Sequence, residues 1–272
     1  MERPARQSRS ATARPASRMR RLLAGMMLIG LLWLPVVVAE PARPTKPVLA
    51  PFEAEYALFK DDIEVGIAER RLVALPEGRW RYESLAHATG FIALLVPDHI
   101  RETSTFRLHR RQLRPLEYRY DKTGGSEEEH YDVVFDWRGD ETRYAHNGET
   151  FPLPGDAADL LGFQIDLMLR LRRGRKYVNF TLALKDGLQE YAFRRKGRET
   201  WPLSDGTLEL LRIEQIPNER PERFTLWVAP SLDYLPVRIE RRKNGKLTAF
   251  ELRRYNGRLI ERAEDEEEEE EP

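Results

Sequence analysis

Histidine and serine side chains are the most versatile catalytic groups in this chain, and their positions form no recognisable site. The five histidines, His87, His99, His109, His130 and His146, are scattered, without a His-Glu-x-x-His or His-x-His arrangement. Those spacings place two imidazoles close enough to share a zinc ion. The Gly-x-Ser-x-Gly pattern, which holds a serine nucleophile on a sharp turn, is also missing. The sequence therefore predicts no metal ligands and no catalytic residues.

Carboxylates, glycines and cysteines would offer other chemistry. Paired carboxylates can hydrolyse glycosidic bonds, but with 45 acidic residues in the chain their pairing is a property of the fold. Nucleotide cofactors bind glycine-rich loops that open a helix, whereas Gly124 and Gly125 lead into three glutamates. Without any cysteine there is no thiol nucleophile and no disulfide. We expect no cofactor, and a protein that is not an enzyme.

One apolar segment is a candidate for ligand binding. It contains Phe91, Ile92, Leu94 and Leu95 and ends at Pro97. A continuous apolar run of this length more often reports burial in a core than a function. In a curved sheet, however, the same run could line the mouth of a cavity. If the chain binds an apolar ligand, we expect those four side chains to contact it.

The elements that would position these residues are mainly strands. Apolar and polar residues alternate in short segments separated by turn residues, at the spacing typical of β-sandwiches and barrels. The predicted strands cover 52–58, 63–75, 79–84, 100–108, 116–121, 128–137, 141–146, 178–184, 189–195, 208–215, 224–228, 236–242 and 247–255. Asn244-Gly245 is the strongest hairpin signal among their turns. We expect a single antiparallel, strongly curved sheet or a half-open barrel.

One segment departs from this pattern and predicts a helix near 156–171. Pro154-Gly155 breaks the preceding strand, Asp156 can cap the first turn, and Gly174 can end the helix. The segment is apolar around most of its circumference, which is typical of a helix buried on more than one side. We expect it to lie at the centre of the fold, against the concave face of the sheet.

The two ends of the chain have compositions of their own. Residues 1–39 carry seven arginines and then an apolar run that ends in Val37-Val38-Ala39, which predicts a secretory signal peptide cleaved before Glu40. An uncleaved membrane anchor is the alternative. Residues 40–51 are rich in proline and predict a linker, the sheet should fill 52–258, and 259–272 form an acidic tail that we expect to be disordered.

Charge narrows the choice of partners. Without residues 1–39 the chain keeps 38 of its 45 basic residues and 44 of its 45 acidic ones, eight of them in 264–271. This balance gives no basic field for a nucleic acid. No second apolar run is long enough to span a bilayer. We therefore expect a soluble protein after cleavage, exported to the periplasm.

Several short motifs resemble a family of exported bacterial proteins, the domain of unknown function 3108. The motifs lie at 56–58, 63–66, 116–120, 134–137, 226–230 and 235–240, with Gly245 after them, and they span most of 52–255. The closing hairpin is also similar, more weakly, to that of periplasmic lipoprotein carriers. The resemblance implies a strand-rich envelope protein, and it brings no catalytic residues.

Two functions remain open from the sequence. The first is non-enzymatic binding of a lipid-like or other apolar ligand between sheet and helix, because a half-open barrel of this size can hold one small molecule. The second is docking on another envelope protein through a sheet edge or the acidic tail.

Overall fold

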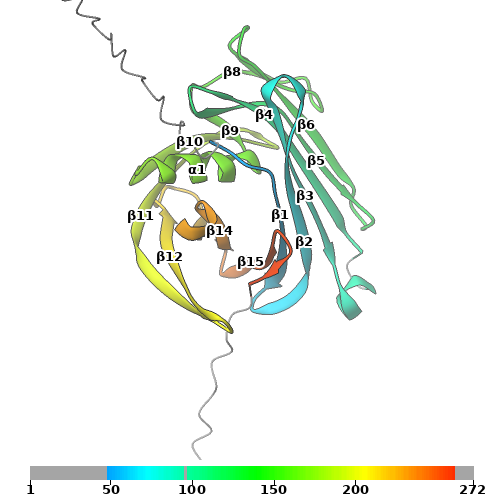
Figure 1. The fold of residues 1–272 in the computed structure, drawn as a ribbon. Coiled ribbons are helices and arrows are strands. Elements are labelled where there is room, and N and C mark those ends of the chain that lie inside the picture. The colour runs from blue at the N-terminus through cyan, green and yellow to red at the C-terminus, as the bar shows by residue number, and fades with distance from the viewer. Residues whose placement is uncertain (1–47, 95–96, 261–272) are drawn as a thin grey trace, which may run out of the picture. The chain divides into compact units, whose positions relative to one another are not determined.

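The alternating segments form one large sheet in a computed structural model of the chain, which describes residues 48–94 and 97–260 (Figure 1). Within these ranges there are sixteen strands, one α-helix and three short 3-10 helices. The strands are β1 (Phe52–Lys60), β2 (Ile63–Ala74), β3 (Arg79–Ala88), β4 (His99–His109), β5 (Gln112–Thr123), β6 (Glu129–Asp136), β7 (Glu141–Tyr144), β8 (Thr150–Pro152), β9 (Ala157–Asp159), β10 (Tyr177–Leu184), β11 (Gly187–Leu203), β12 (Gly206–Gln215), β13 (Glu222–Ala229), β14 (Leu235–Lys243), β15 (Lys246–Tyr255) and β16 (Arg258–Leu259). The helices are α1 (Gly162–Arg172), η1 (Pro76–Gly78), η2 (Gly90–Leu94) and η3 (Pro230–Leu232).

The sheet order confirms the predicted single sheet, with one change. Neighbours run β8-β7-β6-β5-β4-β3-β2-β1-β15-β14-β13-β12-β11-β10-β9, and β16 pairs with β15. Consecutive strands pair as antiparallel hairpins, and β1 joins β15 to connect the beginning of the fold with its end. The change is β9, which pairs with β10 in parallel, so the described sheet is mixed rather than purely antiparallel. A parallel neighbour requires a crossover, and α1 provides it.

The turn chemistry explains why the hairpins form where the sequence predicts them. Asn244 and Gly245 have positive φ angles of 51° and 79°, the conformation that a two-residue hairpin turn requires. β11 is longer than predicted and continues past residue 195 to Leu203. The predicted strands are confirmed, whereas β8, β9 and β16, with two or three residues each, are too short to show a period in the sequence.

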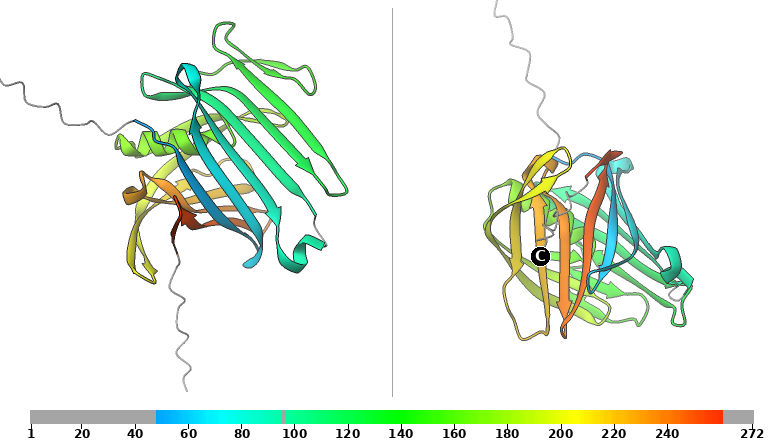
Figure 2. Two further views of the ribbon diagram at one scale, coloured as in Figure 1. Left: turned by 45° about the vertical axis from the view of Figure 1, so that its right-hand side comes forward. Right: turned by 90° about the horizontal axis from the view of Figure 1, so that it is seen from below.

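The sheet curls around α1, and β3 to β6 continue outward as a flatter wing (Figures 1 and 2). At the inner edge, β9 approaches β4 and β5, but no ladder between them is found in the described ranges. Side chains make the connection instead, because the Ser104 hydroxyl of β4 donates a 2.6 Å hydrogen bond to Asp159 of β9. The curl is therefore closed by a buried polar contact rather than by backbone pairing.

Helix α1 begins later than predicted, at Gly162, and nine of its eleven residues are buried. Asp156 does not cap it, because its side chain accepts a 3.0 Å hydrogen bond from Thr181 of β10. Gly174 ends the helix as predicted, with φ at 78° and its N–H donating to the Leu171 carbonyl at 2.8 Å. On one side Phe163 packs on Phe180 and Phe193, with ring centroids 5.9 and 6.0 Å apart. The expectation of a central helix buried on more than one side is confirmed.

The two ends of the curled sheet are packed differently. At the end that carries the 110–111 turn, the inward-facing Phe52, Leu72 and Tyr82 are almost fully buried, and the ring centroids of Phe52 and Tyr82 lie 5.8 Å apart. At the opposite end, which carries the 61–62 and 244–245 turns, inward-facing side chains stay half-buried. We call these the filled end and the open end.

Parts of the predicted organisation lie outside the described residues. These are the signal peptide at 1–39, residues 40–47 of the linker and residues 261–272 of the acidic tail. Within the described part, Leu49 is buried against the core, and the Val48 carbonyl accepts a 2.9 Å hydrogen bond from Arg172. None of the helices in this part is long and apolar enough to cross a bilayer.

Candidate functional site

A buried arginine stands inside the curled sheet. Arg70 lies in β2 at an inward position, and only 4% of its surface is exposed. Its guanidinium carbon lies 4.7 Å from the ring centroid of Tyr56 and 4.8 Å from that of Phe250. Two aromatic faces therefore hold the guanidinium plane in place, an arrangement that favours a cation.

The polar partners of Arg70 are neutral. Its Nη1 donates a 2.6 Å hydrogen bond to Oε1 of Gln164 on α1, and the Tyr82 hydroxyl interacts with the same guanidinium. Its Nε is buried and has no hydrogen-bond partner. Among the described residues, no carboxylate lies within 4.0 Å of Arg70. The positive charge is thus held firmly but not neutralised by a direct ion pair.

The nearest acidic group in the same inward row is Glu102 of β4. The register places Arg70, Ser84 and Glu102 side by side across β2, β3 and β4. Glu102 is half-buried and accepts a 2.6 Å hydrogen bond from the Tyr118 hydroxyl. Burial raises the pKa of Glu102, although the Tyr118 hydrogen bond and the charge of Arg70 oppose the shift. Glu102 therefore takes up a proton more readily than an exposed glutamate.

A second buried charge, Asp159, lies where β9 meets β4. Its Oδ2 accepts the Ser104 hydroxyl, and its Oδ1 accepts the backbone N–H groups of Leu161 at 3.0 Å and Gly162 at 2.5 Å. Burial raises the pKa of Asp159 to about 6, although these three donors oppose the shift. A Cβ at position 162 would lie 2.6 Å from the Ser104 Oγ, so only glycine fits there. Asp159 thus closes the curl and caps α1.

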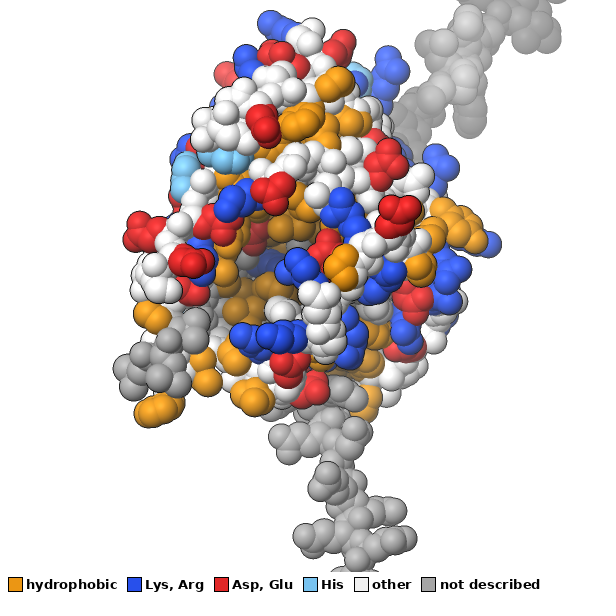
Figure 3. All heavy atoms as spheres, turned by 180° about the vertical axis from the view of Figure 1, so that it is seen from behind, with side chains coloured by type: hydrophobic (Ala, Val, Ile, Leu, Met, Phe, Trp, Pro, Cys, Tyr) orange, Lys and Arg blue, Asp and Glu red, His pale blue; other side chains and the backbone are white. Residues whose placement is uncertain are grey.

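A hollow with hydrophobic walls opens beside the Arg70 row. The inward-facing Leu58, Ile100, Tyr120 and Phe250 are half-buried although they pack on the core. The space-filling view shows such a hollow, with hydrophobic side chains inside it and charged side chains around its edge (Figure 3). At the filled end, a void of about 30 Å³ lies between α1 and β1, and an open depression of about 220 Å³ lies beside Arg111 and Arg172. Solvent, or a ligand, can therefore reach the interior from the open end.

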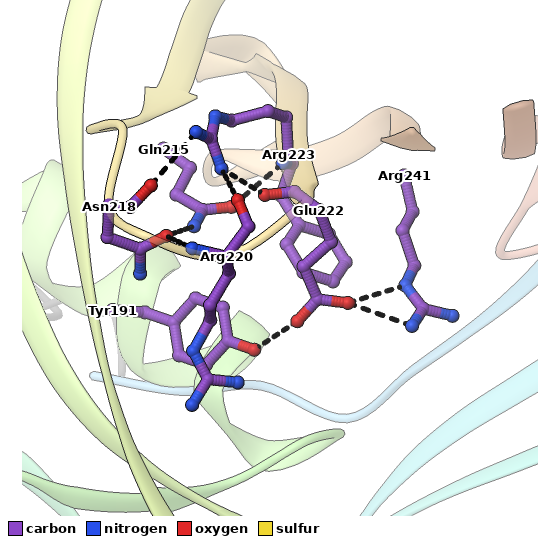
Figure 4. A network of polar contacts seen from close by, with 8 residues as sticks. Tyr191, Gln215, Asn218, Arg220, Glu222, Arg223 and Arg241 are labelled. Carbon is purple, nitrogen blue, oxygen red and sulfur yellow. Dashed lines mark hydrogen bonds and ion pairs between the residues drawn. The ribbon is translucent and has the colours of Figure 1, made fainter. Parts of the chain in front are cut away.

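A polar network occupies one side of the open end, where β11, β12, β13 and β14 meet (Figure 4). Glu222 accepts a 2.5 Å hydrogen bond from the Tyr191 hydroxyl and bonds of 2.8 and 3.1 Å from Arg241. Burial opposes these contacts, yet they hold the pKa of Glu222 below its ordinary value. Arg220 lies 5.5 Å from the Tyr191 ring centroid. In this rim of Tyr191, Glu222 and Arg241, the charge of Arg241 is thus already neutralised.

The outer face of the sheet carries a depression of about 460 Å³ over β1 to β4. Its outward side chains carry both signs of charge, and Arg71 pairs there with Glu53 at 3.2 Å. Further along this face, the exposed His130 contacts Asp121 at 2.5 Å and Asp132 at 3.0 Å, and the Asp121 hydrogen bond is the main cause of its raised pKa. The charged side chains that pair on this face are exposed to solvent.

The predicted ligand-contacting segment lies in the connection between β3 and β4, which is at the open end. Phe91 is 75% exposed and Ile92 is half-buried, so Phe91 is not part of the core. The side chain of Leu94 and the whole of Leu95 lie outside the described residues. The structure thus places Phe91 and Ile92 at the open end, and contact of the predicted segment with a ligand stays a prediction.

In the part of the chain that the structure describes, no group of three His, Asp or Glu side chains is arranged so that it could hold a metal ion. His87 and His99 stack across β3 and β4 with ring centroids 5.8 Å apart. The absence of an enzymatic activity and of a cofactor stays an expectation.

Arg70 and Gln164 are the candidate residues that the sequence interpretation missed. A signal for Arg70 exists, because it stands in phase with the inward Ala68 and Leu72, whereas Glu69 and Arg71 point outward. An arginine at an apolar phase of an alternating strand indicates a buried charge. For Gln164 the helix pattern gives no comparable signal, because nearly every side of α1 is buried.

Comparison with known proteins supports the predicted family. No curated protein matched the chain. A solved structure from Brucella abortus, described as a beta-barrel-like protein of the domain of unknown function DUF1849, is 10% identical, with a TM-score of 0.49 over 80% of this chain and 99% of that one. The family model described as protein of unknown function (DUF3108) matches residues 52–250. The resemblance read from the sequence is thus confirmed, and the chain belongs to the DUF3108 family.

Proposed function

We propose that this protein binds one lipid-like, apolar molecule inside the curled sheet, after export to the periplasm. The observation that carries the proposal is the set of inward-facing apolar side chains that stay half-buried at the open end, Leu58, Ile100, Tyr120 and Phe250. Inward-facing apolar residues of a small barrel are normally covered by other side chains. Leaving them accessible costs hydrophobic stabilisation, about 25 cal/mol per Å² of apolar surface, which a bound apolar ligand would recover.

Placement in the periplasm rests on the composition of the N-terminal segment. The arginine-rich start followed by an apolar run is typical of a secretory signal, and a protein without cysteine needs no disulfide to fold there. A carrier of apolar molecules is useful in an aqueous compartment between two membranes, where a free acyl chain is poorly soluble. The role is one of binding, without a chemical step.

The alternative, docking through a sheet edge, has less support. The two edges of the described sheet are β8, which has three residues and contains Pro152, and β9, whose three residues are buried. Short edges and edge prolines discourage pairing with another strand. The other docking element, the acidic tail, lies outside the described residues, so it enters only as an outcome of the test.

Native mass spectrometry of the mature protein, isolated from envelope extracts, tests the proposal. We expect a fraction of the protein to carry one lipid-sized molecule, and we expect a fluorescent fatty acid to be displaced by long-chain competitors. Protein without bound lipid that also fails to bind the probe would contradict the proposal. A stoichiometric protein partner lost on deletion of 264–271 would favour docking instead.

A pair of variants in the first hairpin locates the binding. Leu58→Lys places a charge in the hollow, and Ile63→Lys places the same charge on an apolar residue that is 63% exposed. We expect Leu58→Lys to weaken probe binding at least about tenfold, because burying an unpaired ammonium is costly. Ile63→Lys should bind as the wild type does, and thermal melting should show both proteins folded. Equal binding by both variants would place the probe elsewhere.

A further inference from the structure

We propose that Arg70 receives the anionic head group of an acyl-chain ligand, so that the head lies at the inner end of the hollow and the tail points to the open end. This inference rests on the proposed function and adds the chemical class of the ligand. Carboxylates and phosphates share the required chemistry, since both present oxygens that match a guanidinium.

The first argument is the charge balance at Arg70. A buried cation is stable when it is paired or fully hydrogen-bonded. Arg70 is 96% buried, yet its Nε lacks a partner, and the groups that its guanidinium contacts within the described residues, the Gln164 amide and the Tyr82 hydroxyl, are neutral. An anion in the hollow would supply the missing charge.

The second argument is that Arg70 is held ready for a ligand. Tyr56 and Phe250 flank the guanidinium, and Gln164 ties it to α1. Because the side chain is already ordered, binding an anion costs little further conformational entropy. Phe250 is half-buried and belongs to the wall of the hollow, so Arg70 stands one side chain away from the ligand space.

The third argument separates Arg70 from the arginines of the rim. Arg241 already makes two hydrogen bonds to the carboxylate of Glu222. An anion there would compete with Glu222 and with water. An ion pair between the ligand and the exposed Arg241 would also add little to the binding free energy. Among the described residues Arg70 makes no ion pair, and only 4% of its surface is exposed, which favours a ligand that enters head first.

The protonation state of Glu102 influences the affinity of the Arg70 site for an anion. It lies in the same row, and its negative form repels a ligand anion while its protonated form does not. Burial raises its pKa, and an incoming anion would raise that pKa further. Replacing Glu102 by glutamine removes the repulsion and keeps an oxygen that can accept the Tyr118 hydroxyl. This substitution should therefore strengthen anion binding.

The test compares ligands that differ only in their head group. Hexadecanoate, hexadecyl phosphate and hexadecanol compete with an uncharged fluorescent probe at about pH 8, where the carboxylate is ionised. We expect the wild type to prefer one or both anions over the alcohol by about ten- to a hundredfold, the worth of a hydrogen bond to a charged group. The carboxylate and phosphate arms show which anion the site takes.

Variants tie that preference to Arg70. Arg70→Met should abolish it, Glu102→Gln should increase it, and Arg71→Met should leave it unchanged because Arg71 lies next in the chain on the outer face. If Arg70→Met does not fold, the wild-type preference and the Glu102→Gln gain still decide. Equal binding of anion and alcohol to the wild type would overturn the inference and leave the proposed function standing. Failure of all three ligands to bind would overturn both.

Discussion

Asp159 and Arg70 are buried charges of opposite sign in the interior of one curled sheet, and their surroundings differ. Asp159 has three hydrogen-bond donors, two from the backbone and one from Ser104, and all of them belong to the elements that it joins. Arg70 has aromatic neighbours and a neutral amide, with an unpartnered Nε. One charge is satisfied within the fold, and the other is satisfied only in part.

The difference separates a structural group from a candidate functional one. Evolution tolerates a buried charge when the fold satisfies it, and a charge left unsatisfied costs stability unless a ligand completes it. Asp159 stands between β9, β4 and α1 and closes the curl, whereas Arg70 stands beside the hollow. We therefore expect substitutions at Asp159 to act on folding and substitutions around Arg70 to act on binding.

The largest effect should come from Asp159→Ala. The substitution leaves the N–H groups of Leu161 and Gly162 and the Ser104 hydroxyl without their acceptor. We expect the free energy of unfolding to fall by about 4 kcal/mol, as when a buried hydrogen-bond network is broken. Urea denaturation measures this value. Asp156→Ala, which removes one contact to Thr181 at the surface of the same segment, should cost less than about 1 kcal/mol.

The pH dependence of stability should reveal the same carboxyl. Its folded-state pKa of about 6 is above the unfolded value of 3.8, so the folded state binds more protons between these pH values. The contribution of Asp159 to stability is therefore greatest below the unfolded pKa and falls as the pH rises to about 6, by about 3 kcal/mol in total. The unfolding free energy of the wild type minus that of Asp159→Asn should fall by most of that amount between about pH 4 and pH 7. A constant difference would mean that Asp159 has an ordinary pKa.

A smaller loss is expected from Gly162→Ala. The new Cβ would lie 2.6 Å from the Ser104 Oγ and 2.8 Å from the Asp159 Oδ2, so the closing contacts would have to move. Overpacking of this kind costs about 1–3 kcal/mol. Gly155→Ala is the matched control because nothing lies within 4 Å of its Cβ, and its melting temperature should match that of the wild type. Equal melting temperatures for both variants would show that the closure has room to spare.

The smallest effect is expected from a substitution that gives Arg70 a carboxylate partner inside the protein. Gln164→Glu places a carboxylate where the amide oxygen now lies 2.6 Å from Arg70 Nη1. Stability should change little, because a new buried ion pair roughly offsets its desolvation. The preference for hexadecanoate over hexadecanol should drop by about tenfold, or about 1.4 kcal/mol, in the displacement assay. Gln112→Glu, at the exposed first residue of β5 at the filled end, should keep the full preference.

The strands, the central helix and the family could be predicted from the sequence because they depend on local patterns. Alternation gives the long strands, Asn244-Gly245 gives the hairpin of β14 and β15, and Gly174 marks the end of α1. The start of α1 was predicted too early because both Asp156 and Asp159 are good capping residues. The hydrogen bond from Thr181 to Asp156 forms only in the folded protein, and it shows that Asp159 rather than Asp156 lies at the start of α1.

The site could not be predicted in the same way. Arg70 and Gln164 are 94 residues apart in the chain and meet only because the sheet curls around α1. The inward phase of Arg70 in β2 indicates burial but not which charges surround it. The sequence also drew attention to the apolar segment that begins near Phe91, the longest apolar run outside the N-terminal segment. In the structure, however, the Phe91 side chain is exposed at the open end.

The most direct test of the account is a crystal structure of the protein with dodecanoic acid that carries a bromine atom on its last carbon. The anomalous signal of bromine locates the tail, and the remaining density locates the carboxylate. The account predicts the carboxylate within hydrogen-bond distance of Arg70 and the bromine at the open end, towards the Tyr191–Glu222–Arg241 rim. A carboxylate at the rim with bromine near Arg70, or a hollow that stays free of ligand, would contradict it.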